Sequence, residues 1–304
     1  MKTLTLAALA ALALGAAACS PSPERAEAPA APATPASADV HPFKIGALQA
    51  WALRDGRMTI PNDNKALGVG RTPQEAAALL TAAGLPGDTI SLSIQPLLIR
   101  DGDRIVLIDT GAGGQMGTEG RLQASLAAAG VRPDQVTDIL ISHSHGDHVG
   151  GLVNAAGGLA FPNAVIRMSA AEWAAAQDQA PAAALVKAIT PKVQTFVPGA
   201  VVAPGISSVA IDGHTPGHVG YEIVSGADSL LYIGDAMHSA ILSVQRPEWA
   251  NAWDENRAVA AASRQALMER AASRNLRLYA GHFPWPGLGR IQRRDDGFVW
   301  VPET

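Results

Sequence analysis

The chain has 304 residues, of which 48% are hydrophobic and 16% charged, and its formal net charge is −4 at pH 7. This length supports a packed core without disulfides, and the composition excludes both a disordered chain and a basic nucleic-acid binder. The single cysteine, Cys19, excludes an intrachain disulfide and a cysteine-based zinc site. Any bound metal must therefore be held by histidine and carboxylate side chains.

Residues 1–19 have the pattern of an export signal. Lys2 precedes an apolar run that ends in Ala16-Ala17-Ala18-Cys19. The run is shorter than the about 20 apolar residues that a membrane-spanning helix needs. It resembles a bacterial lipoprotein signal, in which the cysteine becomes the lipidated first residue, and cleavage after Ala18 by ordinary signal peptidase is the alternative. We therefore expect an exported, periplasmic protein whose contact with the membrane is a lipid anchor at Cys19.

The next segment, residues 20–40, consists mostly of Pro, Ala, Ser and Thr. Such a composition cannot bury enough apolar surface to fold, so it predicts a disordered linker. The folded domain is expected to span residues 41–304.

The domain alternates predicted strands and helices in two successive halves. The first half has predicted strands at 43–48, 97–99 and 105–108, a helix at 119–129, a helical turn at 133–136 and a strand at 139–141. The second half has a predicted strand at 164–168, a helix at 170–177 opened by Ser169, strands at 206–211, 220–224 and 230–233, a helix at 254–272 closed by Asn275, and a strand at 276–280. This order predicts an α/β fold, an αββα sandwich of two mixed β-sheets with outer helices, although a generic α/β arrangement stays open.

Seven of the eight histidines fall in four short clusters, each just after a predicted strand. The eighth, His41, lies at the linker junction, where we expect it to be solvated. Loops that leave strand ends converge on one rim of a sheet and commonly carry function. The histidine distribution therefore predicts a single functional site.

The strongest cluster reads His143-Ser144-His145-Gly146-Asp147-His148. The two-residue period of extended backbone sends His143 and His145 the same way, so both can hold one metal ion. Gly146 lets the chain turn, so that Asp147 and His148 can face a second ion. A catalytic zinc ion needs three protein ligands and an open position. Further ligands are therefore expected from the later clusters, at His214, Asp235 and His282.

The motif His143-x-His145-x-Asp147-His148, preceded by Ile108-Asp109-Thr110-Gly111 and followed by His214, Asp235 and His282, resembles the metallo-β-lactamase superfamily. The resemblance implies that fold and two Zn²⁺ ions per chain, although such ligands also accept Mn, Fe or Co. It implies that His143, His145 and His214 bind the first ion and that Asp147, His148 and His282 bind the second. Asp235 would bridge the two ions. It also implies that Asp109 supports the fold and the ligands, although a simple turn residue stays open. We expect His218 to support a ligand by a hydrogen bond rather than to bind metal itself, and a buried core histidine stays open.

Two divalent ions about 3.5–4 Å apart can share a water and lower its pKa to about 7, which predicts a metal-bridging hydroxide as nucleophile. Asp147 or Asp235 can orient that hydroxide and take up or release its proton. We therefore expect hydrolysis of an ester-like bond in a small molecule: a lactone, an aryl ester or an organophosphate triester.

This chain differs from some members of the superfamily at two positions that bear on the choice of substrate. The known β-lactamases lack an Asp at the bridging position, which makes β-lactam amides a minor option. Acyl-homoserine lactonases usually have a Tyr three residues after the bridge, where this chain has His238. His238 is therefore expected either to contact substrate as a catalytic residue or to be a packing histidine.

The segments Gly281-His282-Phe283-Pro284-Trp285-Pro286 and Arg246-Pro247-Glu248-Trp249-Ala250 resemble the methyl parathion hydrolase branch. That branch has an apolar, aromatic-lined pocket, which implies that Phe283, Trp285 and Trp249 lie near the substrate. The alternative is that they are ordinary packing aromatics.

Two other functions stay open at this stage. One is a mononuclear iron enzyme that oxidises a persulfide, as some relatives do, and the other is a zinc-binding lipoprotein without turnover. The chain lacks the His-rich tract that a metal buffer would use. No nucleic-acid partner is expected, and the resemblance leaves a homodimer open.

Overall fold

The computed structural model describes residues 38–303. The predicted export signal, Cys19 and most of the predicted linker lie outside the described residues, as does residue 304. Within the described residues, no helix has the length and apolar character required to span a bilayer.

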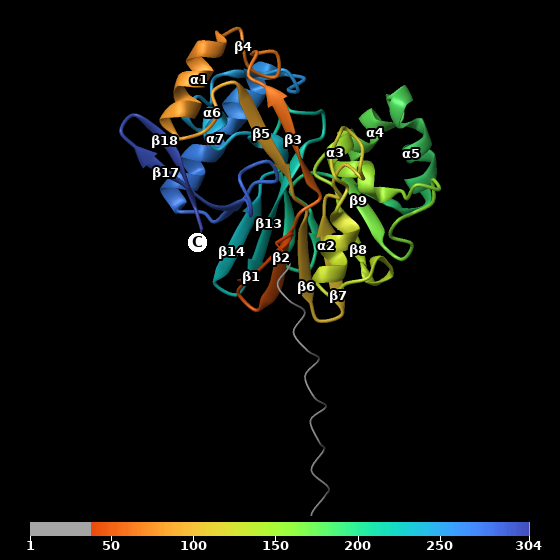
Figure 1. Ribbon diagram of the computed structural model, residues 1–304. Helices are drawn as coiled ribbons and strands as arrows, with labels where there is room; N and C mark the ends of the chain where they lie inside the picture. The colour runs from red at the N-terminus through yellow and green to blue at the C-terminus, as the bar shows by residue number, and fades with distance from the viewer. Residues whose placement is uncertain (1–37, 304) are drawn as a thin grey trace, which may run out of the picture. The chain divides into compact units, whose positions relative to one another are not determined.

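Two seven-stranded sheets form the centre of the domain (Figure 1). The first has the order β1-β2-β6-β7-β8-β9-β10, with bounds β1 (Val40–Ile45), β2 (Leu48–Leu53), β6 (Leu97–Asp101), β7 (Arg104–Ile108), β8 (Asp138–Leu140), β9 (Val165–Ser169) and β10 (Val193–Phe196). The second has the order β11-β12-β13-β14-β16-β17-β18, with bounds β11 (Val201–Ala203), β12 (Ile206–Ala210), β13 (Val219–Ser225), β14 (Asp228–Tyr232), β16 (Leu278–Tyr279), β17 (Leu288–Arg294) and β18 (Gly297–Pro302). Both sheets mix parallel and antiparallel pairs.

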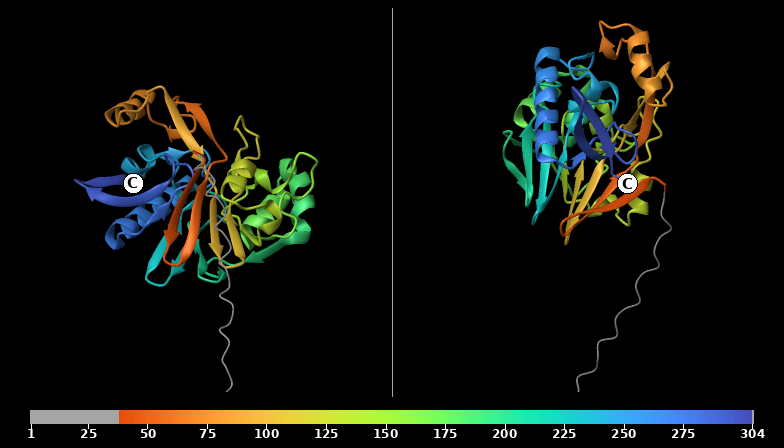
Figure 2. Two further views of the ribbon diagram at one scale, coloured as in Figure 1. Left: turned by 60° about the horizontal axis from the view of Figure 1, so that its bottom comes forward. Right: turned by 90° about the vertical axis from the view of Figure 1, so that its left-hand side faces the viewer.

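Helices cover the outer faces of the two sheets (Figures 1 and 2). The α-helices are α1 (Pro73–Ala82), α2 (Leu122–Ala128), α3 (Gly146–Val149), α4 (Ala170–Asp178), α5 (Ala183–Ile189), α6 (Leu242–Gln245) and α7 (Arg257–Arg274). Short 3₁₀ helices occur at η1 (Pro133–Gln135), η2 (Gly150–Leu152), η3 (Ala180–Ala182), η4 (Thr190–Lys192) and η5 (Gly234–Ala236).

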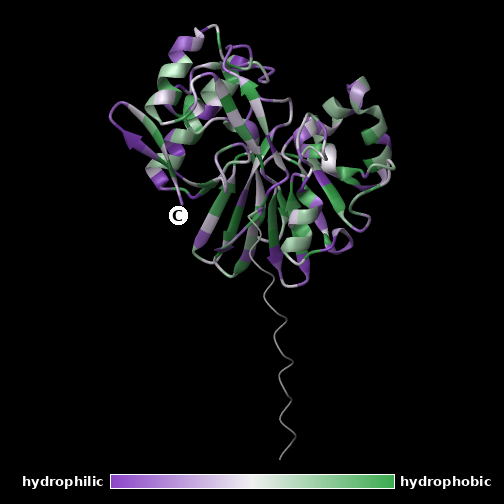
Figure 3. Cartoon of the chain, viewed as in Figure 1, coloured by the Kyte–Doolittle hydropathy of each residue, from purple (hydrophilic) through white to green (hydrophobic). Residues whose placement is uncertain are grey.

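The apolar core has three layers, one between the sheets and one under each set of outer helices. Between the sheets, Ile99 and Ile108 of the first sheet join Tyr221 and Leu230 of the second in one buried cluster. Leu126 of α2 belongs to a second cluster on the outer face of the first sheet, and Met268 of α7 belongs to a third on the second sheet. Among the described residues, hydrophobic residues are prominent in the central strands (Figure 3). The predicted αββα sandwich of two mixed sheets is confirmed.

Capping residues explain where the longer helices begin and end. The side chain of Asn256 accepts the Val259 N–H at the start of α7, and Asn275 ends that helix in the left-handed conformation, with φ of 50°. Ser169 caps α4 by accepting the Glu172 N–H. Both helices were predicted within three residues of these limits.

One predicted strand, 43–48, is wrong because the chain turns within it. β1 ends at Ile45 and β2 begins at Leu48, and the two strands pair as an antiparallel hairpin. Gly46 at the turn has φ of 54°, a conformation that favours glycine. The alternation of apolar residues continues through the turn and conceals it.

A smaller apolar unit, which the sequence did not predict, lies beside the two sheets. It contains α1 and two pairs of short strands, β3 (Gly56–Pro61) with β5 (Thr89–Ile94), and β4 (Leu67–Val69) with β15 (Ala250–Asn251). Leu80 of α1 packs there against Ile90 and Trp249. This unit forms one wall of the cavity described below.

Candidate metal centre

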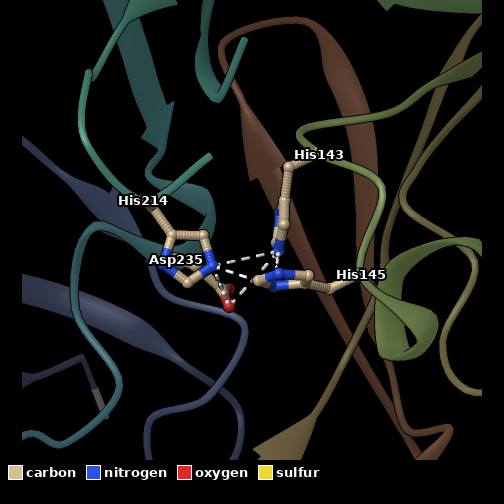
Figure 4. A group of neighbouring side chains, drawn as sticks. All are labelled: His143, His145, His214 and Asp235. Carbon is tan, nitrogen blue, oxygen red and sulfur yellow. Dashed lines mark hydrogen bonds and ion pairs between the residues drawn. The ribbon is translucent and has the colours of Figure 1, made fainter. Parts of the chain in front are cut away.

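The candidate ligands lie on segments that leave the ends of strands. His143 follows β8, Asp235 follows β14 and His282 follows β16. β8 runs parallel to β7, and β14 runs parallel to β16, so these strands end at the same edge of their sheets. His214 lies in the connection between β12 and β13. Figure 4 shows His143, His145, His214 and Asp235 pointing toward one another.

Three imidazoles form the first donor set. The Nε2 of His143 lies 3.0 Å from Nδ1 of His145 and 3.2 Å from Nε2 of His214, and the last two nitrogens are 3.1 Å apart. Zinc–nitrogen bonds of 2.0–2.1 Å in a tetrahedron separate neighbouring ligand atoms by about 3.4 Å. The triangle of nitrogens therefore has the size that a tetrahedral cation requires.

The second donor set contains Asp147, His148 and His282. The Oδ2 of Asp147 lies 3.7 Å from Nε2 of His148 and 3.5 Å from Nε2 of His282. Both of these Nε2 atoms are buried and have no hydrogen-bond partner, and the same is true of Oδ1 of Asp235. Buried polar atoms of this kind need a partner, and a cation supplies one to all three. The residues present thus fit a second divalent ion.

Asp235 lies between the two donor sets. Its Oδ1 is 3.1 Å from Nε2 of His148 and 3.0 Å from Nε2 of His282, whereas its Oδ2 is 3.3 Å from Nε2 of His214. Burial alone would raise the pKa of Asp235, but the surrounding histidines hold it well below its usual value. The carboxylate is therefore ionised, with one oxygen directed to each set.

The second ring nitrogen of several ligands is held by an acceptor. Nδ1 of His148 lies 2.7 Å from Oδ2 of Asp109, Nδ1 of His214 lies 2.9 Å from Oδ1 of Asp254, and Nδ1 of His282 lies 2.7 Å from the Ser93 carbonyl oxygen. A proton on Nδ1 leaves the Nε2 lone pair free for a cation. These contacts fix both the tautomer and the direction of each ring.

Asp109 and His218 support the centre without facing the donor atoms. Asp109 accepts hydrogen bonds from Ser142 Oγ at 2.6 Å and from Tyr232 OH at 2.7 Å, besides its contact with His148. His218 donates from Nδ1 to the Ile211 carbonyl oxygen, and its Nε2 accepts the Asp235 N–H at 2.9 Å. Both ring nitrogens of His218 are therefore used in hydrogen bonds.

Glu172, which no sequence motif indicates, joins two ligand loops. Its fully buried carboxylate accepts the N–H and Oγ–H of Ser144, the residue between His143 and His145, at 2.7 and 2.6 Å. It also accepts Thr215 Oγ1, next to His214, at 2.6 Å. In the sequence Glu172 is simply the third residue of a predicted helix, so its position gave no signal.

Asp254 and Arg264 were also missed. Arg264 donates to Oδ2 of Asp254 at 2.8 Å and to the Ala236 carbonyl oxygen at 2.8 Å, so it contacts both the partner of His214 and the residue after Asp235. Here a signal existed: Arg264 lies at helical spacing on the buried face of α7 with Ala260, Leu267 and Met268. A charged residue on an apolar face needs a buried partner.

Zinc binding is expected to tighten as the pH rises toward 9. Burial lowers the pKa of His214, but hydrogen bonds to Asp235 and Asp254 outweigh burial and raise it to about 9. The pKa of His148 is likewise raised well above 6.5 against burial, by Asp235, Asp147 and Asp109. In the metal-free protein an incoming cation must therefore displace protons below pH 9.

Competition with a chromogenic chelator between pH 6.5 and 9 measures this dependence, and calorimetry in two buffers of different ionisation enthalpy counts the protons released. An affinity that does not change over this range, with no proton release, would contradict it.

Two cavities adjoin the donor sets. One, of about 210 Å³, is lined by Met58, Leu92, Met116 and Trp253 together with several of the candidate ligands. The other, of about 950 Å³, extends from His238 and His282 along α1 and the β3–β5 pair. His238 lines both.

The structure corrects the predicted position of two aromatic residues. Trp285 lines the larger cavity, with the Arg54 guanidinium 4.7 Å above its ring. Phe283 is instead fully buried in the core on the outer face of the second sheet, 4.9 Å from the Trp300 ring. Trp249 packs in the apolar unit around α1. The prediction that Phe283 and Trp249 line the pocket is wrong, because the chain turns at both segments and directs these rings into packed cores.

Comparison with known proteins places this arrangement in a family. The Metallo-beta-lactamase superfamily pattern matches residues 92–282. An N-acyl homoserine lactonase from Bacillus cereus is 30% identical over 155 residues, or 44% of this chain. The match spans 59% of the length of that curated relative.

Two solved structures are similar over nearly their whole length. AidC, described as a dizinc quorum-quenching lactonase in complex with a product, is 29% identical with a TM-score of 0.83, covering 87% of this chain and 97% of that one. AbOPH, described as a hydrolase in the beta lactamase superfamily, is 28% identical with a TM-score of 0.81, covering 88% of this chain and 99% of that one. The chain therefore belongs to the metallo-β-lactamase superfamily and is a metal-dependent hydrolase.

Proposed function

We propose that this protein is a dinuclear zinc hydrolase of ester-like bonds, with lactones as its first substrate class and aryl esters and phosphotriesters as further substrates. One observation carries the proposal: the two oxygens of Asp235 face two separate sets of buried donor atoms beside an apolar cavity. The relatives described as lactonases support the choice of lactones.

The roles of the protein's own residues follow from their positions. When bound, the zinc pair supplies a nucleophile at neutral pH by lowering the pKa of water to about 7. Asp147 lines the smaller cavity, and its side chain is 10% exposed, more than that of Asp235. We therefore assign Asp147 to orient the attacking water and hold its proton. His238, at the junction of the two cavities, contacts the substrate.

The walls of the cavities favour an apolar substituent on the substrate. Met58, Leu92 and Trp253 surround the approach to the donor sets. The larger cavity continues past Leu80, Ile90 and Trp285. An acyl chain or an aryl leaving group would be buried against these side chains, as is usual for sites that bind small apolar ligands.

Removal of the metal is expected to abolish hydrolysis without unfolding the protein. A purified sample would be analysed for metal content and assayed on lactones, aryl esters, phosphotriesters and β-lactams, before and after treatment with a chelator. We expect two zinc equivalents per chain, turnover of lactones or aryl esters, loss of that turnover in the stripped sample, and its return when zinc is added. Circular dichroism of the stripped sample controls for loss of the fold.

Three results would contradict the proposal. One iron per chain together with persulfide oxidation would show that the protein is a mononuclear iron enzyme instead. Turnover of β-lactams alone would show that the proposed substrate class is wrong. Unchanged hydrolysis in the stripped sample would remove the metals from the reaction.

A further inference from the structure

His238 is buried, and both of its ring nitrogens have a partner. Its Nε2 lies 3.0 Å from Oδ2 of Asp235, and its Nδ1 lies 3.0 Å from Nδ2 of Asn251. The ring stacks on His282, with centroids 5.2 Å apart and an interplanar angle of 8°, and lies 5.0 Å from the Trp253 ring. The orientation of the imidazole is therefore fixed from all sides.

The amide of Asn251 has one orientation only. Its Oδ1 accepts the backbone N–H of Trp253 at 2.9 Å, and a backbone N–H can only donate. The NH₂ group of Asn251 must then be the end that faces His238. Because an amide NH₂ only donates, Nδ1 of His238 must accept and carries no proton.

We propose that Asn251 sets the tautomer of His238, so that this neutral ring carries its single proton on Nε2 and serves as a hydrogen-bond donor at the metal centre. A doubly protonated ring would direct an Nδ1–H at the Asn251 NH₂, two donors facing each other. The Nε2–H therefore points to Oδ2 of Asp235 and the adjoining cavity.

The assignment limits what His238 can do in the proposed ester or lactone hydrolysis, on which this part of the inference rests. The nitrogen near Asp235 already holds a proton and cannot take one from water, and releasing it would leave an imidazolate. His238 is thus a fixed donor rather than a general base: its Nε2–H is shared between Oδ2 of Asp235 and a substrate oxygen in the adjoining cavity, where it stabilises developing negative charge. Asn251 is a positioning residue that acts through His238.

Asn251 is well placed for this role because it is itself held rigidly. It is 3% exposed and belongs to β15, which pairs with β4 next to α1. The unit that forms the wall of the larger cavity therefore also fixes the hydrogen-bonding state of a side chain at the metal centre.

The tautomer can be observed directly in the zinc-loaded, full-length protein. With ¹⁵N-labelled histidine, long-range ¹H–¹⁵N correlation spectra distinguish a protonated ring nitrogen from an unprotonated one, and the signals missing in His238→Gln assign the ring. We expect protonated Nε2 and unprotonated Nδ1 for His238. In Asn251→Asp the new carboxylate can only accept a hydrogen bond, which favours a proton on Nδ1, so this pattern is expected to be lost.

Substitutions give an independent kinetic test. The amide nitrogen of Gln can reach the position of Nε2, whereas that of Asn reaches only as far as Nδ1, so His238→Gln is expected to retain more activity than His238→Asn. Asn251→Asp is expected to lower kcat by about 10–100-fold, the usual effect of changing a hydrogen-bond partner behind a metal site. Asn154→Asp is the matched control. Its exposed side chain uses only Oδ1, to accept the Ala156 and Gly158 N–H groups, so activity should not change.

The outcomes separate this inference from the proposed function. A wild-type ring protonated on Nδ1, or on both nitrogens, would overturn the inference whatever the activity, and so would His238→Asn being more active than His238→Gln. If wild-type protein hydrolyses no ester or lactone, the proposed function fails, while the spectra still decide the tautomer. If Asn251→Asp does not fold, the wild-type spectrum and the two His238 variants decide alone.

Discussion

Replacing Asp235 by asparagine is expected to lower kcat/KM for lactones and aryl esters by more than about a hundredfold, above the range seen when a ligand only loses its hydrogen-bond partner. Five imidazoles lie within 3.5 Å of this carboxylate, and its two oxygens face different donor sets. Asparagine keeps the size of the side chain but removes the negative charge and one of the two oxygens. Both the metal content and the rate of hydrolysis should therefore fall.

Steady-state kinetics and metal analysis of the same Asp235→Asn sample measure both effects. Asp228→Asn is a suitable control, because Asp228 is exposed at the opposite end of β14 and accepts a hydrogen bond only from backbone groups, Gly46 N–H and Ser229 N–H. We expect the control to behave as wild type. Two zinc equivalents and an unchanged rate in Asp235→Asn would rule out the bridging role.

Replacing Asp254 by alanine is expected to destabilise the metal-free protein by about 3–5 kcal/mol, the range for breaking a buried ion pair by removing one partner. The Asp254 and Arg264 side chains are 1% and 3% exposed, and their nearest charged atoms are 2.8 Å apart. Without the carboxylate, the guanidinium stays buried with its charge uncompensated. His214 also loses the acceptor that orients its ring.

Urea unfolding of the metal-free protein measures this loss as a lower midpoint. The double variant Asp254→Ala with Arg264→Met provides the control, because it removes both charges and should recover much of the lost stability. Both variants should also bind zinc more weakly at the first donor set, because His214 has lost its acceptor in each. Chelator competition measures this effect. A midpoint that falls no further in the single variant than in the double variant would contradict the buried-charge explanation.

The parts of the fold that the sequence predicted are those with strong local patterns. The strands at 97–99, 105–108 and 139–141 are runs of apolar residues buried on both faces, and they lie within β6 and β7 or overlap β8. The β3–β5 pair was missed because its partners are separated by α1 and a long connection, and because β3 is buried on one face only. Pairing over such a distance is decided by packing, which no local window of sequence contains.

The candidate ligands were predictable for a similar reason: each lies in a short motif beside a strand, and the structure brings all seven together. Their supporting residues were not predictable. Asp254 is 40 residues from His214, and Glu172 is 28 residues from Ser144. Contacts of this kind depend on how loops meet in space. The prediction for the aromatic residues failed for the opposite reason. Phe283 directly follows a candidate ligand in the sequence, but its ring does not lie in the pocket.

The buried carboxylate of Glu172 links the two halves of the domain. It holds the segment after β8, in the first sheet, to the segment between β12 and β13, in the second. Because both segments carry candidate ligands, loss of this one carboxylate would loosen donor atoms contributed by both sheets. A substitution at Glu172 would therefore disturb the centre without altering any of the donor side chains.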